Sequence, residues 1–222
     1  MKFYQKLDGG VHVSAREYDI EAATAVTEGQ LVKLSGGWAV PAAANETGAI
    51  LGIAAENHSG APDALDPRAD GKKLLVIDDP AVVMQCAAPT VTQSGEGSAT
   101  TLTAASADLA VFADGDFTGG YVKLVSKAEE STNADPIGKV RRIAGFAASG
   151  RTFTLESGGA PCAGDVYAVF PPIGFAKGGL GAGRDALVLT AAANLPLKVV
   201  GYDRGLGKIN LIAKKHLFAV DA

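Results

Sequence analysis

The glycine-rich run at residues 177–185, KGGLGAGRD, comes nearest to a ligand-binding motif in this sequence. A phosphate-binding loop requires G-x-x-x-x-G-K-[ST], in which backbone amides and the lysine cradle the phosphates. Here Lys177 precedes the glycines, and neither Ser nor Thr follows them. Gly179, Gly181 and Gly183 do not match the G-x-G-x-x-G spacing of a dinucleotide site either. We therefore expect a flexible surface loop that a partner could order, and no nucleotide site.

Histidine and cysteine are the next residue types that could do chemistry. His12, His58 and His216 are far apart, and the sequence has no H-x-H or H-x-x-x-H pair and no G-x-S-x-G elbow. A metal site built from His58, Cys86 and Cys162 would need the fold to bring them together. We expect Cys86 and Cys162 to be buried free thiols, with a Cys86–Cys162 disulfide as the alternative.

Two clusters of acidic residues are candidate calcium sites. Asp63, Asp66 and Asp70 form one, and Asp114 and Asp116 form the other. Neither supplies the D-x-[DN]-x-[DN]-G pattern with a following glutamate that an EF-hand loop requires. We interpret residues 114–116, DGD, as a turn, because Asp and Gly favour turn geometry. Weak calcium binding at the surface is the alternative.

The basic trio Lys139, Arg141 and Arg142 lies in the strand-like segment KVRRIAG. It would either pair with acidic groups on another subunit or face solvent on an outer strand. The sequence thus assigns no catalytic, cofactor-binding or metal-binding residue, and we expect a protein that is not an enzyme.

The elements that would position these residues are mostly strands. Twenty-eight glycines and ten prolines divide the chain into short segments, which favours strands and turns over long helices. Residues 28–42, EGQLVKLSGGWAVPA, predict a β-hairpin whose two apolar runs are divided at Ser35-Gly36-Gly37. Residues 152–155, TFTL, alternate like a strand with one buried face. Residues 14–23 fit either a short helix with a capping box from Ser14 to Glu17 or an extended segment.

Composition limits the possible partners. The chain of 222 residues is 47% hydrophobic and 20% charged, which is typical of a globular protein. It has no apolar run of the roughly 20 residues that a membrane span needs, so we expect no membrane contact. Residues 1–120 hold 7 basic and 16 acidic residues, whereas residues 121–222 hold 13 and 8. No concentrated basic stripe occurs, and we expect no direct binding of nucleic acid.

These patterns predict a mainly β protein with an N-terminal extended arm and two small domains of β-barrel or sandwich type. The arm would span residues 1–24. Residues 25–92 and 187–222 would form one discontinuous domain, and residues 93–186 an inserted second domain. A tandem split near residue 115 is the alternative.

Two stretches carry a resemblance to a known family. Residues 131–174 contain GKVRRIAGF, RTFTL and AGDVYAVFPP, and this region resembles a segment of the head decoration proteins of tailed bacteriophages. Residues 28–56, EGQLVKLSGGWAVPAAANETGAILGIAAE, are similar to the opening hairpins of phage capsid-stabilising proteins. Together the stretches cover about a third to a half of the chain, and they contain no catalytic signature.

The resemblance implies a virion structural protein, made in the bacterial cytoplasm and located on the capsid exterior. Such a decoration or cement protein would be a homotrimer that binds the major capsid protein and stabilises the shell, without a cofactor. The arm and the glycine-rich run supply the candidate capsid or subunit contacts: Phe3, Tyr4, Lys6, His12, Arg16, Lys177 and Arg184.

Three rival functions remain. One is a carbohydrate-binding or host-binding β module, which would need exposed aromatic platforms. Another is a structural protein of the tail or collar. The third is a small hydrolase or nucleotide-binding enzyme, for which Cys162 facing His58 in a pocket would be the mark.

Overall fold

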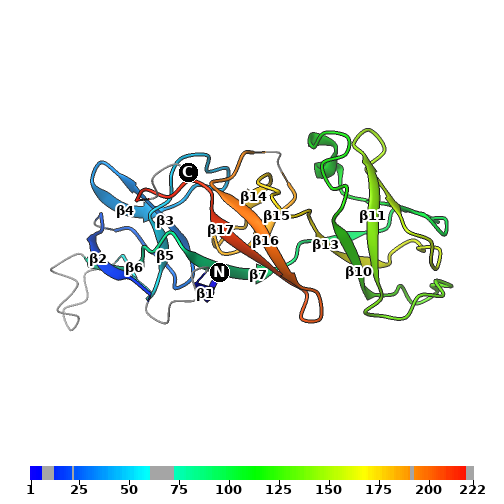
Figure 1. The fold of residues 1–222 in the computed structure, drawn as a ribbon, viewed down its shortest axis with the longest axis horizontal. Helices are drawn as coiled ribbons and strands as arrows, with labels where there is room; N and C mark the ends of the chain where they lie inside the picture. Colours follow the sequence, from blue (N-terminus) through cyan, green and yellow to red (C-terminus); the bar gives the residue numbers. More distant parts are fainter. Residues whose placement is uncertain (7–12, 22, 61–72, 191–192, 219–222) are drawn as a thin grey trace.

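The protein is mainly β and elongated (Figure 1). The computed structural model describes residues 1–6, 13–21, 23–60, 73–190 and 193–218. Four sheets account for the strands in these ranges, and one 3-10 helix, η1 (Ala107–Val111), accompanies them. This architecture confirms the fold class that the glycine and proline punctuation predicted.

A five-stranded antiparallel sheet lies at the end of the molecule drawn on the left in Figure 1. Its strands are, in spatial order, β2 (Ala15–Asp19), β6 (Lys73–Ile77), β5 (Gly52–Ala54), β3 (Leu31–Ser35) and β4 (Trp38–Pro41). Within the segment that fitted either a helix or an extended chain, residues 15–19 are extended, because β2 pairs with β6 over its whole length.

The predicted hairpin is formed by β3 and β4. Ser35 pairs with Trp38, so Gly36 and Gly37 are the two central residues of the turn. Both have positive φ, at 58° and 91°. A tight turn with two positive φ angles suits glycine, because glycine has no Cβ to clash in that region.

A four-stranded sheet occupies the middle of the molecule. Its strands are, in order, β1 (Lys2–Lys6), β7 (Val82–Ala87), β17 (Lys208–Ala213) and β16 (Leu197–Asp203). A short ribbon of β14 (Gly179–Leu180) and β15 (Leu187–Val188) accompanies it. Residues 1–24 thus supply two paired strands, β1 and β2, to two different sheets.

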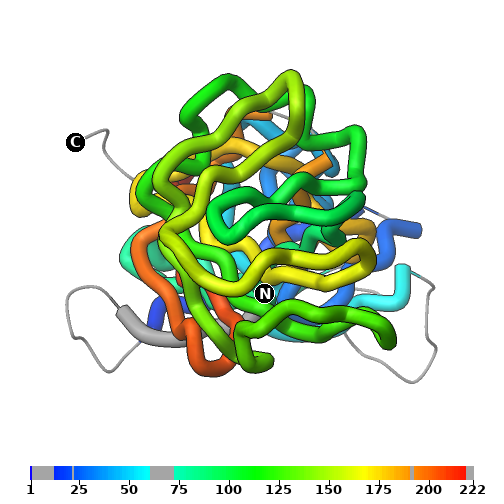
Figure 2. Tube along the Cα trace, turned by 90° about the vertical axis from the view of Figure 1, so that its right-hand side faces the viewer, coloured from blue at the N-terminus to red at the C-terminus, as the bar shows by residue number. Residues whose placement is uncertain are grey.

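A six-stranded sheet forms the other end of the molecule. Its strands are, in order, β8 (Thr90–Thr92), β13 (Val166–Phe170), β10 (Tyr121–Ser126), β11 (Val140–Ala147), β12 (Thr152–Leu155) and β9 (Thr101–Thr103). The outer strands also meet, because Ala105 N donates to Thr92 O and Ser94 N donates to Thr103 O, each at 2.8 Å. The sheet is therefore curled, as the end-on view shows in green and yellow (Figure 2).

Aromatic packing fills this curled sheet. Phe117 is fully buried, and its ring lies 4.8 Å from the ring of Phe146 and 5.4 Å from that of Phe153. Phe153 and Leu155 face inward on β12 while Thr154 is exposed, which confirms the alternation predicted for that strand. Edge-to-face contacts of this kind contribute beyond the apolar area that they bury.

Direct contacts join the six-stranded sheet to the hairpin of β16 and β17. Lys123 Nζ donates to Arg204 O at 2.9 Å and to Gly205 O at 2.6 Å. The ring of Tyr202 packs against Tyr121, with centroids 5.9 Å apart, and against Phe170 at 5.8 Å. The larger hydrophobic core continues through both regions.

Strands that are close in the sequence do not always belong to the same sheet. All strands of the six-stranded sheet lie between residues 90 and 170, and the last strands of the chain join the middle sheet. The β8 strand, at residues 90–92, pairs with β13 in the six-stranded sheet. The β14 and β15 ribbon contacts the first half of the chain, since Leu180 N donates to Ala44 O.

Candidate interaction surface

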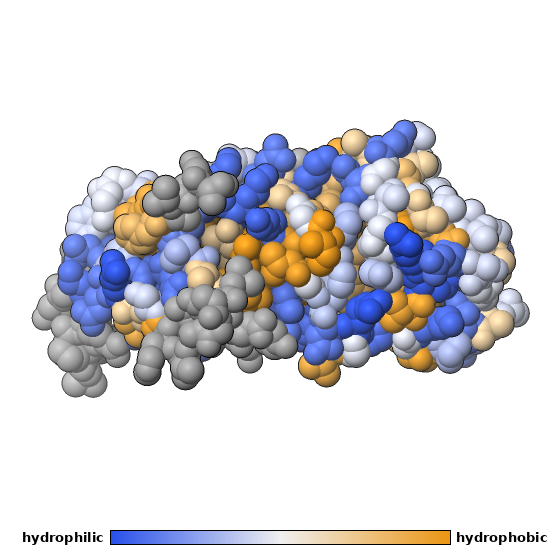
Figure 3. Space-filling view, viewed as in Figure 1, coloured by the Kyte–Doolittle hydropathy of each residue, from blue (hydrophilic) through white to orange (hydrophobic). Residues whose placement is uncertain are grey.

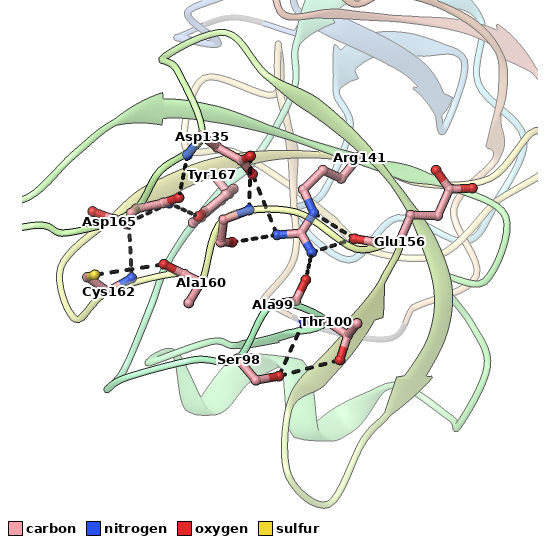
Figure 4. A network of polar contacts seen from close by, with 12 residues as sticks. Ser98, Ala99, Thr100, Asp135, Arg141, Glu156, Ala160, Cys162, Asp165 and Tyr167 are labelled. Carbon is pink, nitrogen blue, oxygen red and sulfur yellow. Dashed lines mark hydrogen bonds and ion pairs between the residues drawn. The ribbon is translucent and has the colours of Figure 1, made fainter.

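The densest polar cluster surrounds Arg141 on β11 (Figure 4). Arg141 is 3% exposed, and its guanidinium donates to the backbone oxygens of Ala99, Glu156 and Gly159. The Asp135 carboxylate lies 3.6 Å from Arg141 Nη1. Burial lowers the pKa of Arg141, although Asp135 opposes this shift. The cation therefore holds three separate loops together.

Asp165 forms a second part of the same cluster. It is fully buried, and it accepts hydrogen bonds from Asn133 Nδ2, Ala128 N and Cys162 N. Burial alone would raise the pKa of Asp165, but these hydrogen bonds outweigh it and hold the pKa below its ordinary value. Burial also raises the pKa of Tyr167, which Asn133 contacts, to about 12.

This cluster has the character of a structural network. Its donors and acceptors are directed at one another and at backbone groups in the loops that join strands of the six-stranded sheet. The expectation that Arg141 faces solvent or another subunit was wrong, because its side chain is buried and paired with Asp135. Strand periodicity contained the signal: Arg141 shares the inward face with Ile143, whereas Arg142 is exposed.

The residues of the enzyme hypothesis lie apart. Cys162 Sγ is 3.4 Å from Thr132 Oγ1, in the region of the six-stranded sheet. His58 is bridged to Val26, and its Nδ1 contacts Thr24 O. Both cysteines are buried free thiols, in agreement with the first of the two sequence expectations. Within the described ranges, no group of three His, Cys, Asp or Glu residues is placed to hold a metal ion.

The glycine-rich run is only partly a surface loop. Gly179 and Leu180 form β14 and Leu180 is buried, whereas residues 181–185 form the turn between β14 and β15, in which Ala182, Gly183 and Asp185 are exposed. Lys177 Nζ pairs with Asp116 at 2.8 Å, and Arg184 Nε donates to Ala42 O at 2.8 Å. The pairing of β14 with β15 and the contacts of Lys177 and Arg184 attach the run to the rest of the fold.

The other candidate contact residues lie near the N-terminus. Phe3 and Lys6 belong to β1, where the structure describes the backbone pairing with β7, and Tyr4 lies between them. His12 lies outside the described residues. Arg16 is exposed, its Nε lies 3.5 Å from Asp78 Oδ2, and its guanidinium lies 5.8 Å from the ring of Phe218.

Sequence reasoning missed an apolar groove between the six-stranded sheet and the β16–β17 hairpin. Its volume is about 380 Å³. Three of its lining side chains are exposed hydrophobics: Val125 at 43%, Ile137 at 64% and Leu206 at 71%. Small residues also line it: Ala88, Gly138, Ala168 and Gly207. We call this feature the hairpin groove.

Further exposed hydrophobic side chains lie elsewhere on the protein. They are Trp38, Val111, Ile173, Leu217 and Phe218. In the space-filling view, apolar residues gather over the middle of the molecule and recur toward both ends (Figure 3). Contiguous exposed apolar surface on a soluble protein typically marks an interaction site.

Comparisons with protein-family models, with curated proteins and with solved structures found no match. In the described part of the chain, no helix has the length and apolar character needed to cross a membrane.

Proposed function

We propose that this protein is a phage virion structural protein that binds the outer surface of an icosahedral capsid and stabilises it. In this role it acts as a decoration or cement protein, without catalysis. Its partner is the major capsid protein, its working form is a homotrimer, and its location is the capsid exterior. The resemblance of residues 28–56 and 131–174 to phage head proteins gives the class.

The observation that carries the proposal is the exposed apolar surface on a protein built of β-sheets that are joined by direct contacts. Large hydrophobic side chains are exposed in the β3–β4 hairpin, at the hairpin groove and near residue 218. Fully burying a large apolar side chain contributes about 1.5–3 kcal/mol, and these side chains, which are already partly covered, would each contribute a fraction of that. Contacts with several capsid subunits, multiplied by three copies in a trimer, would give tight binding through avidity.

Sheet edges offer a second means of attachment. The strand β1 is an outer strand of the middle sheet, and β2 is an outer strand of the five-stranded sheet. The opposite outer strands are partly covered, because Val199 of β16 exchanges hydrogen bonds with residues 174 and 175 and Ala39 of β4 is bridged to Ile20. An outer strand can pair with an extended segment of another protein through main-chain hydrogen bonds. Such pairing suits a protein that must brace a shell and requires no reactive side chain.

The experiment is co-sedimentation with empty, expanded shells of the phage that encodes this chain, after its own copies have been stripped. We expect saturable binding at a fixed number of copies per shell, together with a higher melting temperature of the shell. Shells of an unrelated phage serve as the control. If the protein stays in the supernatant at excess concentration, the proposal fails.

A further inference from the structure

The segment that follows β17, residues 214–218, turns back onto the five-stranded sheet. Ile50, which lies two residues before β5, donates its N–H to Lys215 O at 3.1 Å, and Leu217 N donates to Ile50 O at 2.9 Å. Lys215 Nζ also donates to Thr47 O at 2.9 Å. These bonds attach the end of a strand of the middle sheet to a different sheet. We call residues 214–218 the clasp.

His216 is the buried centre of the clasp. It is 6% exposed and lines a small cavity together with Ile50, Ile53 and Met84. Its Nδ1 accepts a hydrogen bond from Phe218 N at 3.1 Å, and its buried Nε2 makes no hydrogen bond within the described structure. A ring nitrogen that accepts a hydrogen bond carries no proton, so the attached clasp holds the imidazole in its neutral form.

Two acidic side chains act on His216 from the turn between β6 and β7. Asp79 lines the same cavity, and Asp78 is 3% exposed. Their negative charges favour the protonated ring, and the backbone of Leu51 acts in the same direction. Burial acts against all three and outweighs them, so the pKa of His216 lies below its ordinary value of 6.5.

The other titratable groups around the clasp do not reverse this balance. The hydroxyl of Tyr18 donates to Asp78 Oδ2, and Arg16 Nε lies 3.5 Å from the same oxygen. The two lysines of the clasp, residues 214–215, are exposed. Because Tyr18 and Arg16 already engage the Asp78 carboxylate, it compensates only in part for the charge of a protonated His216 ring.

We infer that the clasp is a pH-sensitive device, which detaches from the five-stranded sheet as the pH falls below about 6.5 while the sheets stay folded. A proton on Nδ1 of His216 removes the acceptor of Phe218 N and places a charge in a buried site. In the detached clasp the ring lies in water and binds the proton. Detachment would also uncover the apolar cavity that His216 closes.

The sign and the size of the effect follow from proton linkage. The detached clasp binds a proton near pH 6.5, and the attached clasp binds one only at lower pH. The ratio of detached to attached clasp therefore rises as the pH falls, by about tenfold between pH 7.5 and 5.5.

The test is amide hydrogen exchange of the full-length protein at these two pH values, followed by NMR and converted into protection factors. The amides of Ile50 and Leu217 report on the clasp, because their hydrogen bonds join it to the sheet. We expect their protection factors to fall about tenfold at pH 5.5. Ile143 N, which donates to Gly120 O in the six-stranded sheet, reports on global unfolding. A low concentration of urea should accelerate exchange at Ile143 and leave the clasp amides almost unchanged.

One variant and one matched control assign the effect to His216. His216→Asn keeps an acceptor for Phe218 N and cannot be protonated in this range, so the pH dependence of the clasp amides should disappear. In the control His58→Asn it should remain. His58 Nδ1 accepts a hydrogen bond from Gly60 N in a turn of the same spacing, but His58 does not line the cavity.

Three results would each overturn the inference: unchanged protection factors of the clasp amides at pH 5.5, a pH dependence that persists in His216→Asn, or a urea dependence equal to that of Ile143. The last would mean that the clasp opens only when the whole protein unfolds. The first and third are measured on the native protein, so they decide the matter even if a variant fails to fold. The clasp would open in the protein alone, and the result of the shell experiment does not bear on it.

Discussion

At the scale of single residues, Arg141 is the clearest case of a charge that serves the fold. We expect Arg141→Met to lower the free energy of unfolding by about 3–5 kcal/mol, because it leaves the buried Asp135 carboxylate unpaired. Three backbone oxygens lose their donor as well. Urea unfolding followed by circular dichroism would measure the change.

The matched control for this prediction is the next residue on the same strand. Arg142 is exposed, so Arg142→Met should change the free energy of unfolding by no more than about 0.5 kcal/mol. Similar losses in the two variants would mean that the Arg141 network contributes little to stability.

The buried side chain of His216 predicts that the stability of the folded protein depends on pH. It is 6% exposed, and its Nδ1 accepts a hydrogen bond from Phe218 N, so the ring is held in its neutral form. Burial lowers the pKa of His216 below 6.5, although Asp78 and Asp79 act in the opposite direction. As the pH falls through 6.5, the histidine binds a proton in the unfolded chain but stays neutral in the folded chain. The free energy of unfolding therefore decreases as the pH falls.

The measurement is the melting temperature between pH 7.5 and 5. His216→Asn keeps an acceptor for Phe218 N but cannot take up a proton in this range. We expect the variant to lose part of the decline that the native protein shows below pH 6.5. An identical decline in both proteins would contradict this account of His216.

At the scale of elements, the close approach of β5 and β6 depends on Gly52. A Cβ built at this position would lie 2.0 Å from Ile77 O, which is backbone and has little freedom to move. We expect Gly52→Ala to cost about 2 kcal/mol or more in the free energy of unfolding, since strands must shift to relieve the clash.

Gly95 supplies the control, because a Cβ there meets nothing within 4 Å. Gly95→Ala should change the free energy of unfolding by less than about 1 kcal/mol. Thermal unfolding of both variants, measured side by side, distinguishes a specific contact at Gly52 from a general intolerance to alanine.

How far the sequence predicts these elements depends on the range of the interactions. The β3–β4 hairpin follows from its Gly36-Gly37 turn, and the inward face of β12 follows from alternation. Both signals are local. The pairing of β7 with β17 joins residues more than 100 positions apart, and it has no local signal.

The range of the interactions also decides which residues of the candidate interaction surface can be predicted from the sequence. The charges of Lys177 and Arg184 in a glycine-rich run indicate contacts with a partner, but within the fold they contact Asp116 and Ala42, which are distant in sequence. The hairpin groove could not be predicted either, because Val125, Ile137 and Leu206 meet through the contact of two separate elements.

At the scale of the whole molecule, the proposal includes self-association to a homotrimer. We expect multi-angle light scattering of the purified chain to give three times the chain mass of 22.5 kDa. Trimer formation would cover part of the exposed apolar surface described above. A mass of 22.5 kDa at every concentration tested would remove the trimer from the proposal.

The most direct test of the capsid role is electron cryomicroscopy of stripped, expanded shells after incubation with the protein. We expect added density on the outer surface, in sets of three copies at threefold positions, into which the elongated β protein fits. Maps without added density, or with density confined to the tail or collar, would contradict the capsid role.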